Sequence, residues 1–201
     1  MHNNTIIREQ VDRLGRPAVA MLNREIARLE RHESYKKLLR GILVSIAAAA
    51  AIIILVTNLW APVLQIGGSS MNPLLQMNEI VLAINNDNPA KNDVIAFYHQ
   101  NKLHVKRVIA TAGDSVSIDD YGIVSVNNSV LDEPYVSELS LGICDIEIPF
   151  WVPAGAVFVL GDNRPVSMDS RSSAFGPINR DQIIGKVIFS IWPLPRFGGV
   201  K

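Results

Sequence analysis

Residues 41–60 read GILVSIAAAAAIIILVTNLW, a stretch of twenty residues without a charged side chain. A helix of that length spans roughly 30 Å, about the thickness of the hydrocarbon core of a bilayer. The cores of soluble proteins seldom contain so long an uncharged run, and a cleaved signal peptide has a shorter basic segment before a shorter apolar one. The stretch therefore predicts an uncleaved transmembrane anchor.

Charged residues lie unequally on the two sides of this anchor. The whole chain has a formal net charge of +0, which gives no overall field to attract nucleic acid, so no nucleic-acid partner is expected. Residues 1–40, however, contain nine Lys or Arg and five Asp or Glu, and no Lys or Arg follows the anchor until Lys91. The positive-inside rule therefore predicts a single-pass protein of the cell membrane, with residues 1–40 in the cytosol, residues 41–60 in the lipid bilayer and residues 61–201 outside.

The cytosolic segment shows a helical pattern of its own. Leu22, Ile26 and Leu29 recur at helical spacing among charged residues. This pattern predicts a short amphipathic helix that lies in solvent or on the membrane surface.

The residues after the anchor, 61–201, have a different pattern. Short runs rich in β-branched and aromatic residues alternate with turn-forming pairs such as Gly113-Asp114 and Asn127-Asn128. This alternation predicts an antiparallel β-domain rather than a parallel α/β fold, so the expected fold class is mainly β. The predicted strands cover residues 79–84, 93–98, 103–110, 115–118, 123–126, 156–160 and 183–191.

The chain shows no pattern typical of a metal or cofactor site. Its four His (His2, His32, His99 and His104) and its single Cys144 lack the close spacing of metal ligands. No Gly-rich loop runs from a strand into a helix to hold a phosphate. We therefore expect neither a metal nor a cofactor.

Two polar segments of the β-domain stand out by composition. One is Gly67-Gly68-Ser69-Ser70-Met71-Asn72-Pro73, in which two glycines allow a sharp turn that exposes N–H groups beside a hydroxyl. By itself such a cluster is more typical of a linker. The other, residues 161–171 with the sequence GDNRPVSMDSR, suits either a solvated loop or a polar network that fixes a neighbouring group.

A third segment contains Lys106 and Arg107 in a run of Val and Ile. Alternate residues of a strand share a face, so the two cations cannot both reach water if one face of the sheet is packed. One of them is therefore expected to be partly buried. Burial would lower the pKa of Lys106 toward that of a free amine able to act as a base, whereas a cation at a sheet edge would extend to solvent.

Together these segments resemble the bacterial type I signal peptidases, the membrane-anchored Ser/Lys serine proteases that remove signal peptides from exported proteins. The resemblance runs from the anchor to about Pro193. It rests on four sequence boxes in the order of that family, namely Gly68-Ser69-Ser70-Met71-Asn72-Pro73, Asn92-Asp93-Val94-Ile95-Ala96-Phe97, Lys106-Arg107-Val108-Ile109 with Gly113-Asp114-Ser115-Val116, and Gly161-Asp162-Asn163-Arg164 with Ser167-Met168-Asp169-Ser170-Arg171.

The resemblance implies a role for each matching residue. Ser70 is the expected nucleophile and Lys106 the expected general base. The backbone N–H of Ser70 is expected to contribute to an oxyanion hole that Gly68 helps to shape. Ser167 is expected to orient the Lys106 amine. The loop that presents Ser167 is expected to be braced by Asp162, Asp169 and Arg171.

The resemblance also implies the substrate, a signal peptide of an exported preprotein that binds as an extended strand and is cut after small residues. Some apolar residues either rest on the membrane surface or pack within the domain, and the sequence favours neither. These residues are Trp60, Val63, Leu64, Ile66, Trp192 and Phe197.

Two other functions fit parts of the sequence. A Ser/Lys autoprotease of the repressor type would share the β-domain, but such a protein is soluble and carries a DNA-binding helix-turn-helix, and the anchor argues against it. The alternative from a different class is a non-catalytic β-domain, tethered to the membrane for binding or assembly. The presence of both Ser70 and Lys106 disfavours that alternative.

Overall fold

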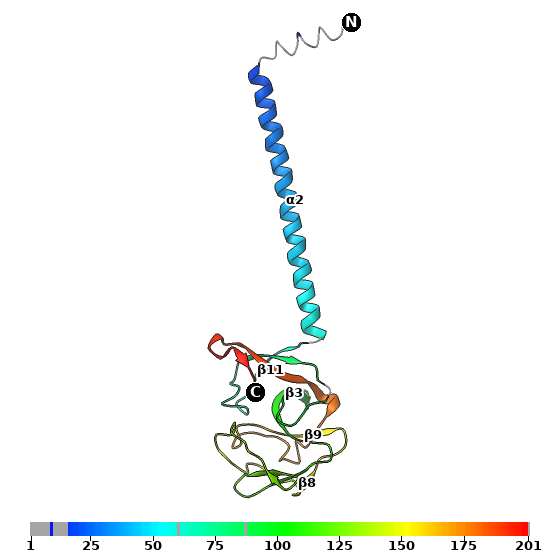
Figure 1. Ribbon diagram of the computed structural model, residues 1–201, viewed down its shortest axis with the longest axis vertical. Coiled ribbons are helices and arrows are strands. Elements are labelled where there is room, and N and C mark those ends of the chain that lie inside the picture. Colours follow the sequence, from blue (N-terminus) through cyan, green and yellow to red (C-terminus); the bar gives the residue numbers. More distant parts are fainter. Residues whose placement is uncertain (1–8, 10–15, 60, 87, 201) are drawn as a thin grey trace. The chain divides into compact units, whose positions relative to one another are not determined.

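The structure, a computed structural model, describes residue 9 and residues 16–59, 61–86 and 88–200. The chain divides into two compact units, Met1–Leu55 and Val56–Lys201. The first unit contains most of a long helix, and the second contains all of the described β-strands (Figure 1). The division falls within the residues predicted as the anchor.

Helix α2 (Arg16–Leu59) is the long helix of the first unit. Its section Tyr35–Leu55 has 21 residues and a mean hydropathy of 2.5, which makes it long and apolar enough to cross a membrane. None of its most apolar window is buried against protein, and side chains such as Leu43 and Ile53 are exposed. In the part of the chain that the structure describes, this is the one candidate for a membrane span.

The predicted amphipathic helix is continuous with the anchor rather than separate from it. After Pro17, which lies in the first turn where proline is tolerated, no Gly or Pro occurs before residue 41. Good helix formers such as Ala, Leu, Glu, Lys and Arg fill the interval, so no residue there favours an end to the helix. Residues 1–8 and 10–15 of the predicted cytosolic segment, and Trp60, lie outside the described residues.

The larger of two sheets has eight strands in the order β1-β2-β11-β3-β4-β9-β10, with β12 paired to β11. All of its pairs are antiparallel. The 3₁₀ helices η1 (Arg180–Gln182) and η2 (Leu194–Arg196) flank β11. The strands are β1 (Val63–Gln65), β2 (Ile80–Ile84), β3 (Val94–His99), β4 (Lys102–Thr111), β9 (Ala156–Leu160), β10 (Ile178–Asn179), β11 (Ile183–Trp192) and β12 (Gly198–Gly199).

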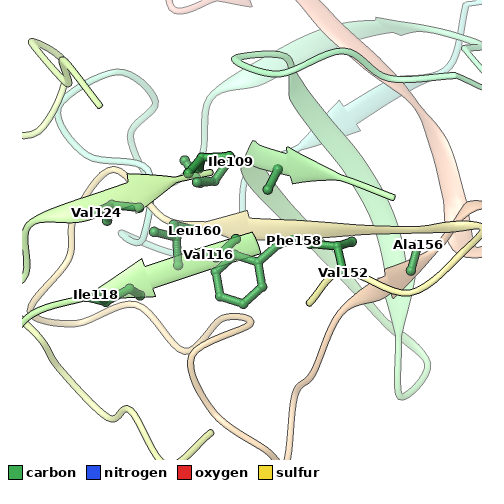
Figure 2. Close-up of a cluster of buried hydrophobic side chains, with 10 residues drawn as sticks. Ile109, Val116, Ile118, Val124, Val152, Ala156, Phe158 and Leu160 are labelled. Carbon is green, nitrogen blue, oxygen red and sulfur yellow. The ribbon is translucent and has the colours of Figure 1, made fainter. Parts of the chain in front are cut away.

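The smaller sheet has the order β7-β6-β5-β8 and is also antiparallel. Its strands are β5 (Ser115–Ile118), β6 (Val124–Val126), β7 (Ser129–Val130) and β8 (Phe150–Trp151). Figure 2 shows Val116 and Ile118 of this sheet beside Phe158 and Leu160 of β9, in one buried cluster. Burial of each such large side chain contributes about 1.5–3 kcal/mol, so this cluster holds the two sheets together.

The prediction of a mainly β, antiparallel fold is confirmed. Each of the seven predicted strands corresponds to an observed strand, with ends that agree within one residue. The strands that the sequence did not predict are β1, β7, β8, β10 and β12. Each of these has only two or three residues, too few for a pattern of alternation to show.

Strand β4 is buried on both faces along its second half. Val105 contacts one hydrophobic cluster, Val108 a second and Ile109 a third. The six residues 105–110 are therefore all buried, Lys106 and Arg107 included. The sequence predicted that one of the two cations would be partly buried. The structure buries both, because each face of β4 is covered by other parts of the domain.

Candidate active site

Ser70 lies in a turn between β1 and β2. The backbone N–H of Asn72 donates to the carbonyl oxygen of Ser69 at 3.1 Å and closes this turn. The next side chain, Met71, is 1% exposed and fixes the turn to the core. The backbone of Ser70 is thus held in place by the hydrophobic packing of the residue that follows it.

Ser70 lines a cavity of about 400 Å³. The cavity lies between the segment 65–71 and the first half of β4, residues 102–105. Its wall includes Gly68, which is exposed, and a Cβ added to Gly68 would meet no atom within 4 Å. The protein itself therefore leaves room at this position, and the role of Gly68 in an oxyanion hole stays a prediction.

The edges of two strands border this cavity. Strand β1 pairs only with β2, and β4 pairs with β9 only from Arg107 onward. Among the described residues, neither β1 nor residues 102–106 of β4 have a strand partner on the remaining edge. Backbone groups at both edges can therefore pair with an added strand.

Lys106 is buried, with only 2% of its surface exposed. Its Nζ donates a hydrogen bond to Oγ of Ser167 at 2.9 Å. Burial lowers the pKa of Lys106 to about 8, against the opposing influence of the Asp169 carboxylate and with a smaller contribution from Arg171. An amine with this pKa is neutral in about half of the molecules near pH 8.

The loop that presents Ser167 is held by a buried ion pair. Nε of Arg171 donates to Oδ1 of Asp169 at 2.8 Å, and both side chains are almost fully buried. Nη2 of Arg171 also donates to the carbonyl oxygen of Ser167 at 3.2 Å, and the N–H of Gly161 donates to Oδ2 of Asp169 at 3.1 Å. These contacts bind both ends of the loop to one carboxylate.

Asp162 forms a second buried ion pair, with Arg107. The Arg107 guanidinium also donates to the carbonyl oxygen of Asn92 at 3.1 Å and lies 3.9 Å from the centre of the Tyr135 ring. Asp162 and Arg107 are 1% and 2% exposed. Because the two charges compensate each other, both can be buried beside Lys106.

Gly161 and Asn163 bring the Ser70 turn and the Ser167 loop together. A Cβ added to Gly161 would collide with Oγ of Ser167 on one side and would lie 2.5 Å from the carbonyl oxygen of Ser70 on the other. The backbone N–H of Asn163 donates to that same Ser70 oxygen at 3.0 Å, and its side chain donates to the carbonyl oxygen of Ser69 at 3.1 Å. Ser70 and Ser167 therefore approach each other across a glycine.

The sequence reasoning gave no role to Gly161, Asn163 or Tyr135. The run Gly161-Asp162-Asn163 after a strand was visible, but it shows only a turn, and the partner of the turn lies in the distant Ser70 segment. Tyr135 lies in a long irregular segment where no pattern marks a residue that stacks on Arg107.

Among the described residues, no hydrogen bond joins the hydroxyl of Ser70 to Lys106, whose Nζ is bonded to Ser167. The structure therefore brings the two predicted catalytic residues to one region without a hydrogen bond between their side chains. In proteins free of substrate, catalytic hydrogen bonds are often long and tighten only when substrate is bound.

His104 also lines the cavity, two residues before Lys106 on β4. Its ring stacks on that of Phe97 with 5.9 Å between ring centres and meets the edge of Phe175 at 5.3 Å. Burial lowers the pKa of His104, and the nearby Lys106 adds to this effect. The imidazole is therefore neutral at pH 7.

The described residues contain no group of three or more His, Cys, Asp or Glu that could hold a metal ion.

Comparisons with known proteins found one matching family, several relatives and a similar crystal structure. A family described as "Signal peptidase, peptidase S26" matches residues 39–192. Signal peptidase IB of Staphylococcus aureus is 35% identical over 182 residues, which cover 81% of this chain and 94% of the relative. Signal peptidase I of Bacillus caldolyticus is 36% identical over 146 residues, 65% of this chain and 79% of the relative. A crystal structure of a signal peptidase I from Enterococcus faecalis is 30% identical, with a TM-score of 0.41, and covers 49% of this chain and 96% of that one.

The protein is thus a serine protease, an enzyme that hydrolyses peptide bonds. More narrowly, the chain belongs to the signal peptidase family, peptidase S26, and has the function of a signal peptidase I. The predicted family and the predicted enzyme class are confirmed, and the alternative of a non-catalytic binding domain is not favoured. The roles of individual residues and the membrane topology stay predictions.

Proposed function

We propose that this chain is a single-pass membrane enzyme that cleaves signal peptides from exported preproteins after small residues, with Ser70 as nucleophile and Lys106 as general base. The observation that carries the proposal is the burial of the Lys106 amine. Its pKa is lowered to about 8, and it is held by Ser167 next to the turn of Ser70. A neutral amine can accept a proton that an ordinary ammonium could not.

In the proposed reaction the neutral Nζ of Lys106 takes the proton of the Ser70 hydroxyl as Oγ attacks the carbonyl carbon of the scissile bond. The resulting ammonium then gives this proton to the leaving amine, and the C–N bond breaks to leave an acyl-enzyme. Lys106 next takes a proton from water as the water oxygen attacks the acyl carbon. The ammonium then gives this proton to Oγ of Ser70 as the acyl C–O bond breaks, and the signal peptide leaves as a carboxylic acid. Acylation and deacylation each return Lys106 to its neutral state.

The backbone N–H of Ser70 is a suitable donor for the negative charge that develops on the attacked carbonyl oxygen. Within the described residues this N–H donates no hydrogen bond. Gly68 lies two residues earlier in the same cavity wall, and its missing side chain leaves space for the substrate carbonyl. Such a preorganised donor stabilises the tetrahedral intermediate more than the ground state.

Ser167 holds the base in place in this proposal. Its hydroxyl is 2.9 Å from Nζ of Lys106, and its own backbone is bound by Arg171. Asp162 and Asp169 act through their buried ion-pair partners, Arg107 and Arg171. These residues keep the amine positioned as its charge changes during the reaction.

The substrate is proposed to bind in the cavity as an extended strand. The two open strand edges, β1 and residues 102–105 of β4, border the cavity and offer backbone donors and acceptors. A peptide between them would place its scissile carbonyl at Ser70. The cavity of about 400 Å³ leaves room for small side chains beside the cut.

The membrane role is supported by the apolar helix section Tyr35–Leu55 and by the basic residues before it. The positive-inside rule assigns the N-terminal side to the cytosol and the β-unit to the outside. Trp192 and Phe197 are 52% and 60% exposed, so the apolar residues near the end of β11 are not packed in the core and suit contact with lipid. Leu64 and Ile66, by contrast, pack in the domain.

The test uses the full chain purified in detergent and a secretory precursor as substrate. We expect a shorter product whose new N-terminus is the first residue after the signal peptide. Ser70→Ala should abolish the product, whereas Ser69→Ala, which removes the neighbouring exposed hydroxyl, should leave it. Cleavage by Ser70→Ala protein at the wild-type rate would contradict the proposal.

A second test addresses topology in sealed cells. Protease added from outside should digest the β-unit and spare an epitope placed within residues 1–40. The opposite pattern would overturn the proposed orientation.

A further inference from the structure

Arg196, in η2, contacts the segment that follows Ser70. Its Nη2 donates to the carbonyl oxygen of Pro73 at 2.8 Å and to that of Leu74 at 2.7 Å. These two carbonyls belong to residues three and four positions after Ser70. One guanidinium thus holds two consecutive peptide groups of the turn by charge-assisted hydrogen bonds.

Arg196 is held in turn by Glu79. Nε of Arg196 forms an ion pair with Oε1 of Glu79, whose side chain is 2% exposed, while that of Arg196 is 33% exposed. The other carboxylate oxygen, Oε2, accepts from the hydroxyl of Ser190 at 3.5 Å. A buried carboxylate without a cation would be strongly destabilising, so Glu79 fixes the place of the guanidinium.

The backbone of Glu79 fastens the other end of the Ser70 segment. Its carbonyl oxygen accepts from the N–H of Ile66 at 2.8 Å, four residues before Ser70. The segment that contains Ser70 is therefore held on both sides. The backbone of Glu79 binds Ile66 before Ser70, and Arg196 binds two carbonyls after it. The side chain of Glu79 in turn binds Arg196.

We propose that Arg196 is a positioning residue for catalysis: together with Glu79 it sets the position of the Ser70 turn relative to Lys106. Ser70 and Lys106 lie on separate elements without a direct hydrogen bond, so their alignment depends on what holds the turn. A shift of the nucleophile by about 1 Å can slow an enzymatic reaction about 100-fold. Release of the two carbonyls would permit such a shift without disturbing Lys106.

The proposal rests on the role of Ser70 as nucleophile proposed above, so the experiment includes Ser70→Ala in parallel. The variants are Arg196→Ala, Arg196→Lys and, as a matched control, Arg180→Ala. Arg180 is an exposed arginine of the same unit that contacts neither Pro73 nor Leu74. Cleavage kinetics, the pH profile and the thermal unfolding midpoint are measured for each full-length protein in detergent.

We expect Arg196→Ala to lower kcat about 10- to 100-fold with KM within about twofold of wild type, because the chemistry and not the groove is disturbed. The lower limb of the pH profile should stay in place, because Lys106 keeps its surroundings. Arg196→Lys should recover only part of the loss, since an ammonium cannot reproduce the planar fork. The Arg180→Ala control should match wild type in every measurement.

Chemical rescue separates positioning from stability. A cavity of about 280 Å³ lies at Arg196 and is lined by Leu74, Glu79 and Ser190. Millimolar methylguanidinium should enter the space left in Arg196→Ala protein and raise kcat without raising the unfolding midpoint. The same addition should not affect Arg180→Ala protein.

Wild-type kcat in a folded Arg196→Ala protein would overturn the proposal, provided that Ser70→Ala is inactive. A loss of activity that follows only the fall in the unfolding midpoint, without rescue by methylguanidinium, would also overturn it. Full activity of Ser70→Ala would instead contradict the proposed function itself, so the two failures can be told apart.

Discussion

Arg107, the residue after Lys106 on β4, forms a bidentate ion pair with Asp162. Nε of Arg107 donates to one carboxylate oxygen at 2.9 Å and Nη2 to the other at 2.7 Å. Asp162 raises the pKa of Lys106 only as a minor influence, and burial is the main cause of the lowered value. Loss of water around the amine, rather than neighbouring cations, is therefore the main reason why a large share of Lys106 is neutral near pH 8.

The first prediction concerns this ion pair. Asp162→Asn should remove a buried carboxylate that binds the Arg107 guanidinium through two hydrogen bonds, and lower the free energy of unfolding by about 3–5 kcal/mol, as measured by urea denaturation. Asp120→Asn, at an exposed position, should change it little. Because the Asp162 carboxylate stabilises the ammonium form, its removal should also move the lower limb of the pH profile to lower pH. An upward move would show that we have misassigned the electrostatic influence of Asp162.

The second prediction concerns cooperation between Ser70 and Lys106. Each single substitution, Ser70→Ala or Lys106→Met, should lower kcat by at least about 1,000-fold, because one step requires both groups. The double variant should be little slower than either single variant. Steady-state kinetics on one precursor provides the measurement, and multiplicative losses would point to independent roles.

The third prediction separates Lys106 from His104 as the base. With Lys106, kcat/KM should rise with pH through about 8, since only the neutral amine accepts the proton. With His104, whose pKa is lowered from its usual value, the rise would be complete at a lower pH than with Lys106. His104→Gln should therefore keep most activity, and Lys106→Arg should not, because a guanidinium stays charged. A folded His104→Gln protein as inactive as Ser70→Ala would refute the assignment of Lys106.

The same amine gives a stability measurement that is independent of turnover. Folding lowers the pKa of Lys106 from 10.5 to about 8, so between these values the unfolded chain binds more protons than the folded one. The free energy of unfolding should therefore rise with pH across this window. Lys106→Met protein should lack this rise, which urea denaturation at several pH values would detect.

The sequence predicted the fold well where elements are long. Strands such as β4 and β11 are recognisable from their long apolar runs, and the anchor is recognisable from its uncharged, apolar composition. The two- and three-residue strands were not predicted, because pairing with neighbouring strands rather than local sequence preference makes them extended. The sequence reasoning separated a short cytosolic helix from the anchor, although no helix-breaking residue lies between Pro17 and Gly41.

For the site, the sequence indicated residues with reactive groups. It did not indicate residues that allow two segments to approach closely or that bind a segment distant in the sequence. The pairing of Lys106 with Ser167, 61 residues later, was expected only from the family resemblance, because their hydrogen bond depends on how β4 and β9 pair. Gly161 carries no functional group, and its importance appears only when the atoms around its Cα are known. Arg196 has no motif around it and gains its contacts through η2.

The fourth prediction uses Gly161. A methyl group there would collide with Ser167 and the Ser70 carbonyl, so Gly161→Ala should lower the free energy of unfolding by about 1–3 kcal/mol. It should also reduce kcat, because the two segments of the site must separate. Gly198→Ala is the matched control, since a Cβ at Gly198 meets no atom within 4 Å. Equal stability of the two variants would show that the site tolerates a wider spacing.

The fifth prediction concerns the substrate. Enlarging the residue just before the cut from Ala to Phe should stop cleavage at that bond, because a large side chain would displace the scissile carbonyl from Ser70. Gel analysis of precursors that differ only at this residue would test it. A matched change three residues after the cut provides a control for precursor folding. Efficient cleavage after Phe would exclude a pocket for small side chains.

The contacts around the site join parts of the chain that are synthesised far apart. Lys106 bonds to a residue 61 positions later, and Arg196 to a carbonyl 122 positions earlier. Such long-range contacts form late in folding, because the chain between them must first be ordered. A nascent chain that ends at β9 contains neither Ser167 nor Arg196. On the roles proposed for Ser167 and Arg196, such a chain lacks the groups that hold the base and the nucleophile, so activity would require synthesis to continue through η2.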